Sequence, residues 1–465
     1  MGQRKDKRSQ RAFTPVSARG GELARPSDKA LEIRLRQAAA LRDAGRLQEA
    51  MALCRRILEL QPQNPAALGL AATIAWHRSD YNEALALASR VVALSPGDAE
   101  AHSNLGAVLQ SLGKWREAIA CYERACGLRP TYLKAWLNLG SACLQAGNHE
   151  RALAGFRKAL KIDANSAVAL SGIGACCRKL GRADDAVRAL ERAKRAQPGD
   201  HAVLYNLAAA LGDTGRAGEA LAAGEAALAA RPGDTRTLAL KAALHLEAGE
   251  RAAAGVLLDF ARLISVADPA APDGQGAAAD FNAALATHLA AHPTLRYEPP
   301  TKATKVGWQS GEILMRPEGP VRALKAMIVQ AVEAYLAAHS ADPSHPFLAR
   351  PPARWRLKGW ATVLGPGGHQ TSHIHPLAWL SGCYYVQVPD EIARAAARPE
   401  GWSEGWIEFG RPAAEMPTTA EPLIHLVEPL AGRIVLFPSY FNHRTIPFTA
   451  TEKRISVAFD VIPEA

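Results

Sequence analysis

The stretch that decides the fold of the C-terminal part is G-G-H-Q-T-S-H-I-H-P at residues 367–376. Short runs rich in β-branched and aromatic residues follow it: S-G-C-Y-Y-V-Q-V-P at 381–389, G-R-I-V-L-F-P-S-Y-F-N-H at 432–443 and K-R-I-S-V-A-F-D-V at 453–461. Runs of this kind, separated by Gly and Pro, are typical of strands. They predict a double-stranded β-helix (jelly-roll) domain with flanking helices.

Three histidines in this region form a candidate metal site. His373 and His375 are two residues apart, so on a strand both imidazoles point to the same side. His443 follows another strand and is expected to come from a neighbouring one. Neutral imidazoles on one face can bind a first-row divalent metal and leave other positions open. We therefore predict His373, His375 and His443 as metal ligands.

A candidate carboxylate site lies at the start of the last strand. Arg454 and Ser456 are two residues apart and share a face of that strand. Arginine presents a bidentate fork to a carboxylate, and serine adds a hydroxyl. The alternative for Arg454 is an ordinary surface ion pair. Tyr385 is a further candidate for this pocket, with a position in the aromatic core as the alternative.

These residues resemble the Fe(II)/2-oxoglutarate-dependent oxygenases, and in particular a bacterial subgroup with the motifs H-x-H-P, S-G-x-Y-Y and R-x-S. The resemblance covers residues 281–465. It implies that the histidines hold Fe(II), that Arg454 and Ser456 bind the distal carboxylate of 2-oxoglutarate, and that O2 takes the remaining iron position. It implies no catalytic residue beyond the ligands of metal and cosubstrate.

One departure from that family concerns the metal ligands. His375 stands where the family usually has a carboxylate, and no Asp or Glu lies between Trp360 and Pro389. Iron is then held either by three histidines or by His373 and His443 alone, while a distant carboxylate such as Glu408 is disfavoured.

Two other hypotheses remain open. Gly367-x5-His373-x-His375 and Gly432-x5-Pro438-x4-His443 also resemble the two cupin motifs, which implies another metal-dependent enzyme or a binding protein. Cupins do not require R-x-S, and this favours the oxygenase. The second hypothesis is a non-catalytic adaptor with an inactive barrel, and the missing carboxylate is the feature in its favour.

The N-terminal half repeats with a period of 34 residues. Alanine recurs at every such step from Ala50 to Ala254, and glycine recurs from Gly45 to Gly249 with Ser79 as the one exception. This pattern resembles the tetratricopeptide repeat (TPR). Helical hairpins of this kind stack into an all-α superhelix with a concave groove. We predict a TPR array at residues 31–262 and a linker at 263–280, before the oxygenase-like domain.

One polar column of the repeats is a candidate peptide-binding site. Asn104, Asn138 and Asn206 occupy equivalent positions, and an asparagine amide can both donate to and accept from a peptide bond. The alternative is an ordinary polar position on an exposed helix face. The resemblance implies that the groove recruits a protein or peptide partner.

The remaining composition narrows the class of protein. Residues 1–30 hold eight Lys or Arg against three Asp or Glu, which predicts a basic disordered tail. No nucleic-acid recognition motif accompanies this charge, so a nucleic-acid partner is not expected. The sequence has no secretory signal and no long apolar run, so we expect no membrane partner and a cytoplasmic location. Together the features predict a 2-oxoglutarate-dependent dioxygenase that hydroxylates a protein or peptide.

Overall fold

The computed structural model describes residues 28–272, 277–300, 302–339, 342–393, 401–414, 416 and 418–464. They form two compact units that divide after Ala146, inside the repeat region. Most of the predicted basic tail lies outside the described residues. Within the described residues, no helix is both long and apolar enough to span a lipid bilayer.

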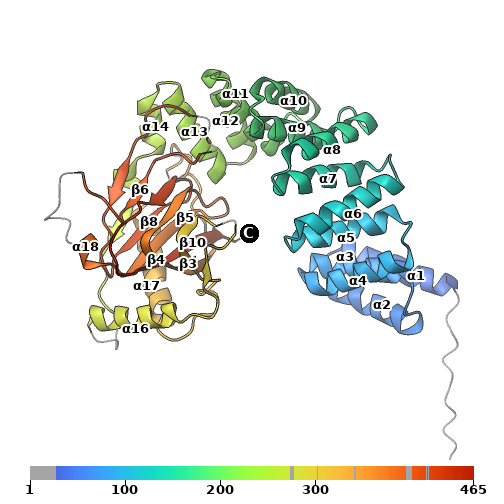
Figure 1. Ribbon diagram of the computed structural model, residues 1–465, viewed down its shortest axis with the longest axis horizontal. Coiled ribbons are helices and arrows are strands. Elements are labelled where there is room, and N and C mark those ends of the chain that lie inside the picture. Colours follow the sequence, from blue (N-terminus) through green and yellow to red (C-terminus); the bar gives the residue numbers. More distant parts are fainter. Residues whose placement is uncertain are drawn as a thin grey trace, which may run out of the picture. The chain divides into compact units, whose positions relative to one another are not determined.

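The first unit consists of repeat helices (Figure 1). The two helices of each hairpin pack against each other, as the 34-residue period predicts. Its helices are α1 (Asp28–Asp43), α2 (Leu47–Leu60), α3 (Pro65–His77), α4 (Tyr81–Leu94), α5 (Ala99–Ser111), α6 (Trp115–Leu128) and α7 (Leu133–Gln145).

The second unit continues the repeats and then forms the sheet domain. Its helices are α8 (His149–Ile162), α9 (Ala167–Lys179), α10 (Ala183–Ala196), α11 (His201–Asp213), α12 (Ala217–Ala230), α13 (Thr235–Glu247), α14 (Arg251–Leu257), α15 (Phe260–Leu263), α16 (Ala278–Ala290), α17 (Val321–Ala338) and α18 (Asp390–Ala393).

The repeat columns have the conformations that their residue types predict. The glycines between paired helices have positive φ, for example 71° at Gly113, where a helix ends in the left-handed region. Ser79, the exception in this column, takes the same conformation with φ 62°. The alanines of the other column, from Ala50 to Ala254, are fully buried where paired helices approach closely. The TPR prediction is thereby confirmed.

Ten strands form one curled antiparallel sheet, which confirms the predicted jelly-roll class. They are β1 (Ser265–Ala267), β2 (Arg296–Tyr297), β3 (Thr304–Gln309), β4 (Trp355–His373), β5 (Leu380–Gln387), β6 (Ile407–Phe409), β7 (His425–Val427), β8 (Ile434–Pro438), β9 (His443–Thr445) and β10 (Arg454–Pro463). Their order is β1-β8-β5-β10-β4-β9-β6-β7, with β2 and β3 branching from β4.

The long strand β4 connects the two parts of this sheet. Its first half pairs with β10, from Trp355 opposite Pro463 to Leu364 opposite Arg454. Its end pairs with β9 after a register shift, and there His373 lies opposite His443. The curl of β4 therefore brings the face of β10 and the end of β9 to one site.

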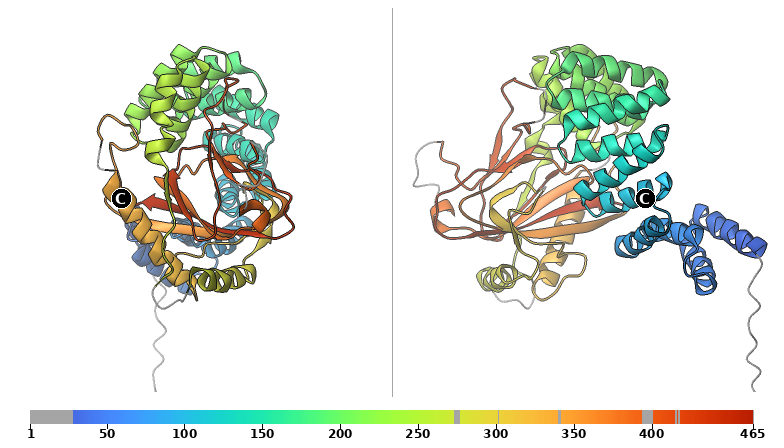
Figure 2. Two further views of the ribbon diagram at one scale, coloured as in Figure 1. Left: turned by 90° about the vertical axis from the view of Figure 1, so that its left-hand side faces the viewer. Right: turned by 45° about the vertical axis from the view of Figure 1, so that its right-hand side comes forward.

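Two helices cover the sheet on one side (Figure 2). Helix α16 contacts β5 and helix α17 contacts β8. Leu324, Ile328 and Val332 of α17 are fully buried. The flanking helices that the sequence predicts are therefore present and contact the sheet.

Within the second unit, the last repeat helices and the sheet domain share one hydrophobic core. Leu238 of α13 and Leu257 of α14 belong to the same cluster of buried residues as Phe441. The hydroxyl of Tyr440 donates to the carbonyl of Leu257. The predicted linker contributes to this domain as well, because β1 pairs with β8. The proposed boundary at residue 262 stays a prediction.

Candidate metal and cosubstrate site

The sheet brings the three predicted histidines together. His373 and His443 are cross-strand partners on β4 and β9. His375 lies two residues beyond the end of β4, where its backbone N–H donates to the carbonyl of Ser439 at 3.0 Å. One ligand atom from each ring lies within 4.8 Å of the others. This spacing fits a single metal ion.

Hydrogen bonds orient each ring for that role. Nδ1 of His373 lies 2.7 Å from the carbonyl of Thr371, and Nδ1 of His443 lies 2.9 Å from the carbonyl of Phe441. Because a carbonyl oxygen only accepts, both Nδ1 atoms carry the proton. The Nε2 lone pairs are then available to a metal, and Nε2 of His373 lies 3.2 Å from Nε2 of His375.

Burial keeps two of these rings neutral. It lowers the pKa of His373 to about 4, with a further contribution from the nearby His375. The pKa of His443 is well below its ordinary value, first through burial and then through the other two histidines. Neutral imidazole is the form that binds metal, so the site holds its ligands ready at neutral pH.

A carboxylate that sequence analysis missed stands behind the third histidine. Oδ1 of Asp460, on β10, lies 2.6 Å from Nδ1 of His375. The hydroxyl of Ser381 donates to the same oxygen at 2.8 Å and also lies 2.8 Å from the hydroxyl of Ser439. Strand alternation places Asp460 on the face of Ser456, and this was the signal available in the sequence. The carboxylate orients a candidate ligand and is not itself one of the three grouped residues.

Glu408 is not a ligand in this arrangement. It lies opposite Arg444 in the pairing of β6 with β9. Neighbouring residues of a strand point to opposite faces, so Glu408 faces away from His443, which precedes Arg444. Its two carboxylate oxygens accept from Arg411 and from Arg444, at 2.7 and 3.0 Å for Arg444. A carboxylate that is paired with two guanidinium groups in this way is not free to bind a metal.

The predicted carboxylate site is buried inside the sheet domain. Arg454 is 3% exposed and its guanidinium lies 4.8 Å from the centre of the Tyr385 ring. Within the described part of the chain, no carboxylate pairs with Arg454. Ser456 lies opposite both Thr362 and Tyr385 in the strand pairing. The structure thus brings all three predicted cosubstrate residues together.

Several polar atoms around Arg454 are buried without a hydrogen-bond partner among the described residues. They are Nε of Arg454, the hydroxyls of Tyr385 and Thr362, and the indole nitrogen of Trp360. The Trp360 ring stacks on His375 with 5.6 Å between centres, so this polar cluster continues towards the histidines. Buried polar groups are normally paired, and such a cluster fits a polar ligand with a carboxylate.

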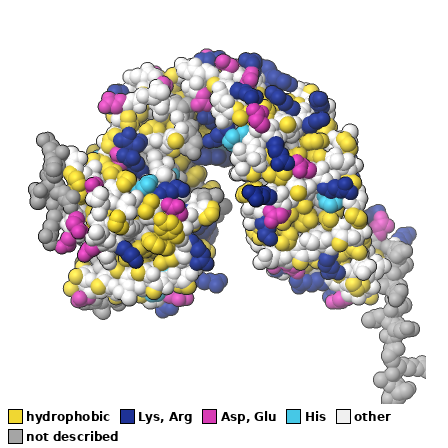
Figure 3. All heavy atoms as spheres, in the orientation of Figure 1, with side chains coloured by type: hydrophobic (Ala, Val, Ile, Leu, Met, Phe, Trp, Pro, Cys, Tyr) yellow, Lys and Arg dark blue, Asp and Glu magenta, His cyan; other side chains and the backbone are white. Residues whose placement is uncertain are grey.

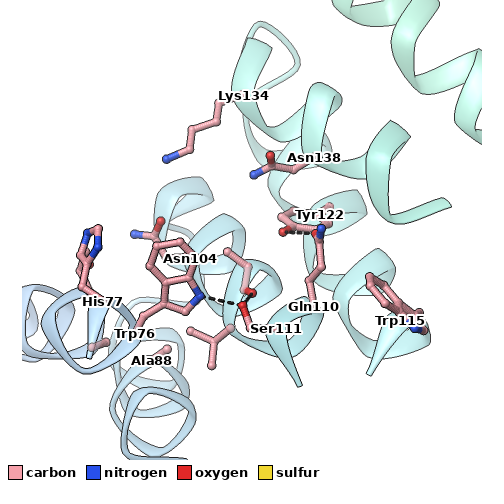
Figure 4. A pocket seen from close by; sticks show the side chains of 14 residues that line it. Trp76, His77, Ala88, Asn104, Gln110, Ser111, Trp115, Tyr122, Lys134 and Asn138 are labelled. Carbon is pink, nitrogen blue, oxygen red and sulfur yellow. Dashed lines mark hydrogen bonds between the residues drawn. The ribbon is translucent and has the colours of Figure 1, made fainter. Parts of the chain in front are cut away.

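The predicted asparagines occupy two different settings. Asn104 and Asn138 line a cavity of about 630 Å³ in the first unit, together with Trp76, Tyr122 and Lys134 (Figure 4). Asn206 belongs to the second unit, where its amide donates to the hydroxyl of Ser171 at 3.2 Å. Peptide binding by these residues stays a prediction, because their geometry only shows which of them border a cavity.

Comparison with known families agrees with this architecture. Residues 358–460 match the family described as "Putative 2OG-Fe(II) oxygenase". Tetratricopeptide repeat families match residues 3–65, 103–167 and 144–211, and the family of anaphase-promoting complex, cyclosome, subunit 3 matches 43–125. The chain therefore combines tetratricopeptide repeats with a domain of the oxygenase type.

Solved structures resemble the repeat part. A tetratricopeptide repeat protein from Parabacteroides merdae is 19% identical, with a TM-score of 0.42, and the match covers 50% of this chain and 92% of that one. The Thermus thermophilus TPR protein TTC0263 is 24% identical, with a TM-score of 0.33 and coverage of 39% and 98%. No curated protein matches the chain.

Proposed function

From a chain of tetratricopeptide repeats and an oxygenase-type domain, we propose an Fe(II)- and 2-oxoglutarate-dependent oxygenase that hydroxylates a protein or peptide. Bound Fe(II), with 2-oxoglutarate and O2 as cosubstrates, supplies the oxidising chemistry. His373, His375 and His443 would hold the metal. Arg454, Ser456 and Tyr385 would hold the distal carboxylate of 2-oxoglutarate.

The buried guanidinium of Arg454 is the observation that carries this proposal. An unpaired charge taken out of water costs several kcal/mol, on the order estimated for buried ions. A structure keeps such a charge where a ligand of opposite charge compensates it. The unpartnered Tyr385 hydroxyl beside it supplies a second donor, because burial raises the Tyr385 pKa well above its ordinary value and the phenol keeps its proton.

Aromatic rings pack against two of the histidines. The Phe437 ring lies 4.6 Å from that of His443, measured between centres, and the Trp360 ring stacks on His375. Asp460 accepts the Nδ1 proton of His375 and holds that ring with its Nε2 towards the other two histidines. An oriented ligand set favours binding of the metal.

The polypeptide substrate is proposed from the repeats. Within the described residues, the amides of Asn104 and Asn138 have no internal partner, and both border the cavity of the first unit (Figure 4). Free amides beside Trp76 and Lys134 suit a peptide, since they offer donors and acceptors next to an apolar surface. The chemistry of the barrel itself does not require this substrate.

The test is an anaerobic titration of 2-oxoglutarate into Fe(II)-loaded protein, followed by the visible metal-to-ligand charge-transfer band. We expect a saturable band, absent in His443→Ala and weakened in Arg454→Ala. Arg433→Ala is the matched control, because Arg433 pairs with Asp268 at 2.8 Å in the same domain. Iron binding without a band would favour the cupin hypothesis, and a protein that binds no iron would be an adaptor.

A further inference from the structure

A cleft of about 530 Å³ connects the repeats of the second unit with the metal site. Helices α9, α11 and α13 form one wall, with Tyr205 and Ala209 from α11. The sheet domain forms the other wall, with Thr371 and His373 from β4 and Asn442 next to β9. A molecule in this cleft would lie between a repeat surface and one of the three metal-ligand histidines.

The described lining of the cleft carries one sign of charge. Its cationic residues are Arg178, Lys179, Arg236 and Lys302, and no Asp or Glu is among the lining residues that the structure describes. Arg178 pairs with Asp213. Among the described residues, no carboxylate pairs with Lys179, Arg236 or Lys302. Three cations without a paired carboxylate among the described residues attract anions and favour an acidic ligand.

We propose that this cleft binds an acidic segment of the polypeptide substrate and presents it to the metal site. The inference rests on the proposed function, and it names the class of substrate. Small-molecule pockets are lined mostly by apolar and aromatic side chains, whereas four cationic residues line this cleft. A single-stranded nucleic acid would need aromatic side chains on which its bases stack. In the described lining, Tyr205 is the one aromatic side chain apart from His373. The guanidinium of Arg236 already lies over the Tyr205 ring, 5.3 Å from its centre.

The test measures binding without metal or cosubstrate, so its failure is separate from failure of the oxygenase proposal. The probes are three fluorescein-labelled peptides of equal length, in which glycine alternates with Glu, with Gln or with Lys. Fluorescence anisotropy is recorded at low and at moderate salt. We expect the Glu peptide alone to bind, and its affinity to fall with salt because exposed charges are screened.

Charge reversal locates the site. The triple variant Lys179→Glu, Arg236→Glu and Lys302→Glu should weaken binding of the Glu peptide by at least about tenfold. Figure 3 shows many other Lys and Arg side chains over the repeat helices at the top of the view, so a control of equal charge is needed. Lys161→Glu, Lys194→Glu and Arg195→Glu change exposed residues of α8 and α10 and should leave binding nearly unchanged.

Three results would overturn the inference. Equal binding of the Glu and Gln peptides would show that charge does not select the ligand. Equal loss in the two triple variants would show that the cleft is not the site. Tighter binding of a thymidine oligonucleotide than of the Glu peptide would show a nucleic-acid surface instead. A second variant, Lys302→Gln, keeps the test valid if the triple variant fails to fold, and it should weaken binding by a smaller factor.

Discussion

Oδ1 of Asp460 lies 2.6 Å from Nδ1 of His375, although 85 residues separate them in the chain. His375 is the predicted third ligand, at the position where the resemblance to the oxygenases implies a carboxylate, and a carboxylate lies directly behind it. Carboxylate partners raise the basicity of a ligating imidazole and fix its orientation. The Asp460 carboxylate thus lies beside the candidate metal site, behind the His375 ring.

The first prediction concerns this partner. Asp460→Asn should lower the affinity for Co(II), used as a spectroscopic substitute, by about 10- to 100-fold, because His375 loses its charged acceptor. Metal affinity is measured by titration of the Co(II) absorption bands. Asp268→Asn is the control, since Asp268 pairs with Arg433 on the same sheet without contacting a histidine. Equal affinities of the two variants would contradict the role of Asp460.

The second prediction decides between three ligands and two. His375→Ala should lose Co(II) binding as completely as His373→Ala and His443→Ala, because the ligand atoms of all three converge within 4.8 Å. His369→Ala is the control, as this half-buried histidine lies on the same strand as His373 but outside the group of three. If His375→Ala kept Co(II) while the other two variants lost it, His373 and His443 would suffice to bind the metal.

The third prediction uses stability to test the function of Arg454. Arg454→Leu should raise the free energy of unfolding of the ligand-free protein by about 1 kcal/mol or more, because a buried unpaired charge is replaced by an apolar side chain. Thermal unfolding without metal measures this. A ligand that binds the native state raises its melting temperature, so Fe(II) with 2-oxoglutarate should stabilise the parent protein more than this variant. Destabilisation by Arg454→Leu would indicate a structural arginine.

The fourth prediction concerns the contact between α13 and the sheet domain. The carboxylate of Glu247 accepts the backbone N–H of Thr419 at 2.8 Å and of Ala420 at 3.1 Å. These bonds, first that of Thr419, hold the pKa of Glu247 below its ordinary value. Glu247→Gln should therefore destabilise the protein at pH 7 by about 1 kcal/mol, as hydrogen bonds to charged groups do.

The pH dependence of that difference follows from the direction of the shift. A carboxylate whose folded pKa is depressed contributes stability above its unfolded pKa of about 4.3 and loses it as pH falls through the folded value. Chemical denaturation at pH 7 and below pH 4 should show the two proteins converging at the lower pH. A difference that is constant over this range would exclude the charge as its cause.

The fifth prediction concerns the residue that interrupts the column of Asn104, Asn138 and Asn206. Gly172 occupies this column, and a Cβ added there would overlap the ring of Phe156. Gly172→Ala should destabilise the protein by about 1–3 kcal/mol through overpacking. Gly224→Ala, in the interior of α12 with open space around the position, should stabilise it by roughly 0.5–1 kcal/mol. Urea denaturation compares the two, and a stabilising Gly172→Ala would refute the packing argument.

The sequence by itself determined the features that depend on local backbone geometry. A period of 34 residues specifies stacked hairpins, because each glycine ends a helix and each alanine marks a close helix contact. Strand alternation placed Arg454 with Ser456, since residues two apart on a strand share a face. The same argument predicted that His373 and His375 meet, and they do, although His375 lies beyond the end of β4 and is held there by its bond to Ser439. These inferences need no knowledge of distant segments, and the fold class and the candidate ligands followed from them.

Tertiary structure alone decided which distant side chains meet. It placed Asp460 behind His375, left Arg454 without a carboxylate among the described residues, and joined α9, α11 and α13 to the sheet domain around a cationic cleft. Local periodicity cannot foresee such pairs, because they arise from the curl of β4 and from a core shared between repeats and sheet. Packing of segments far apart in the chain is a property of the whole domain.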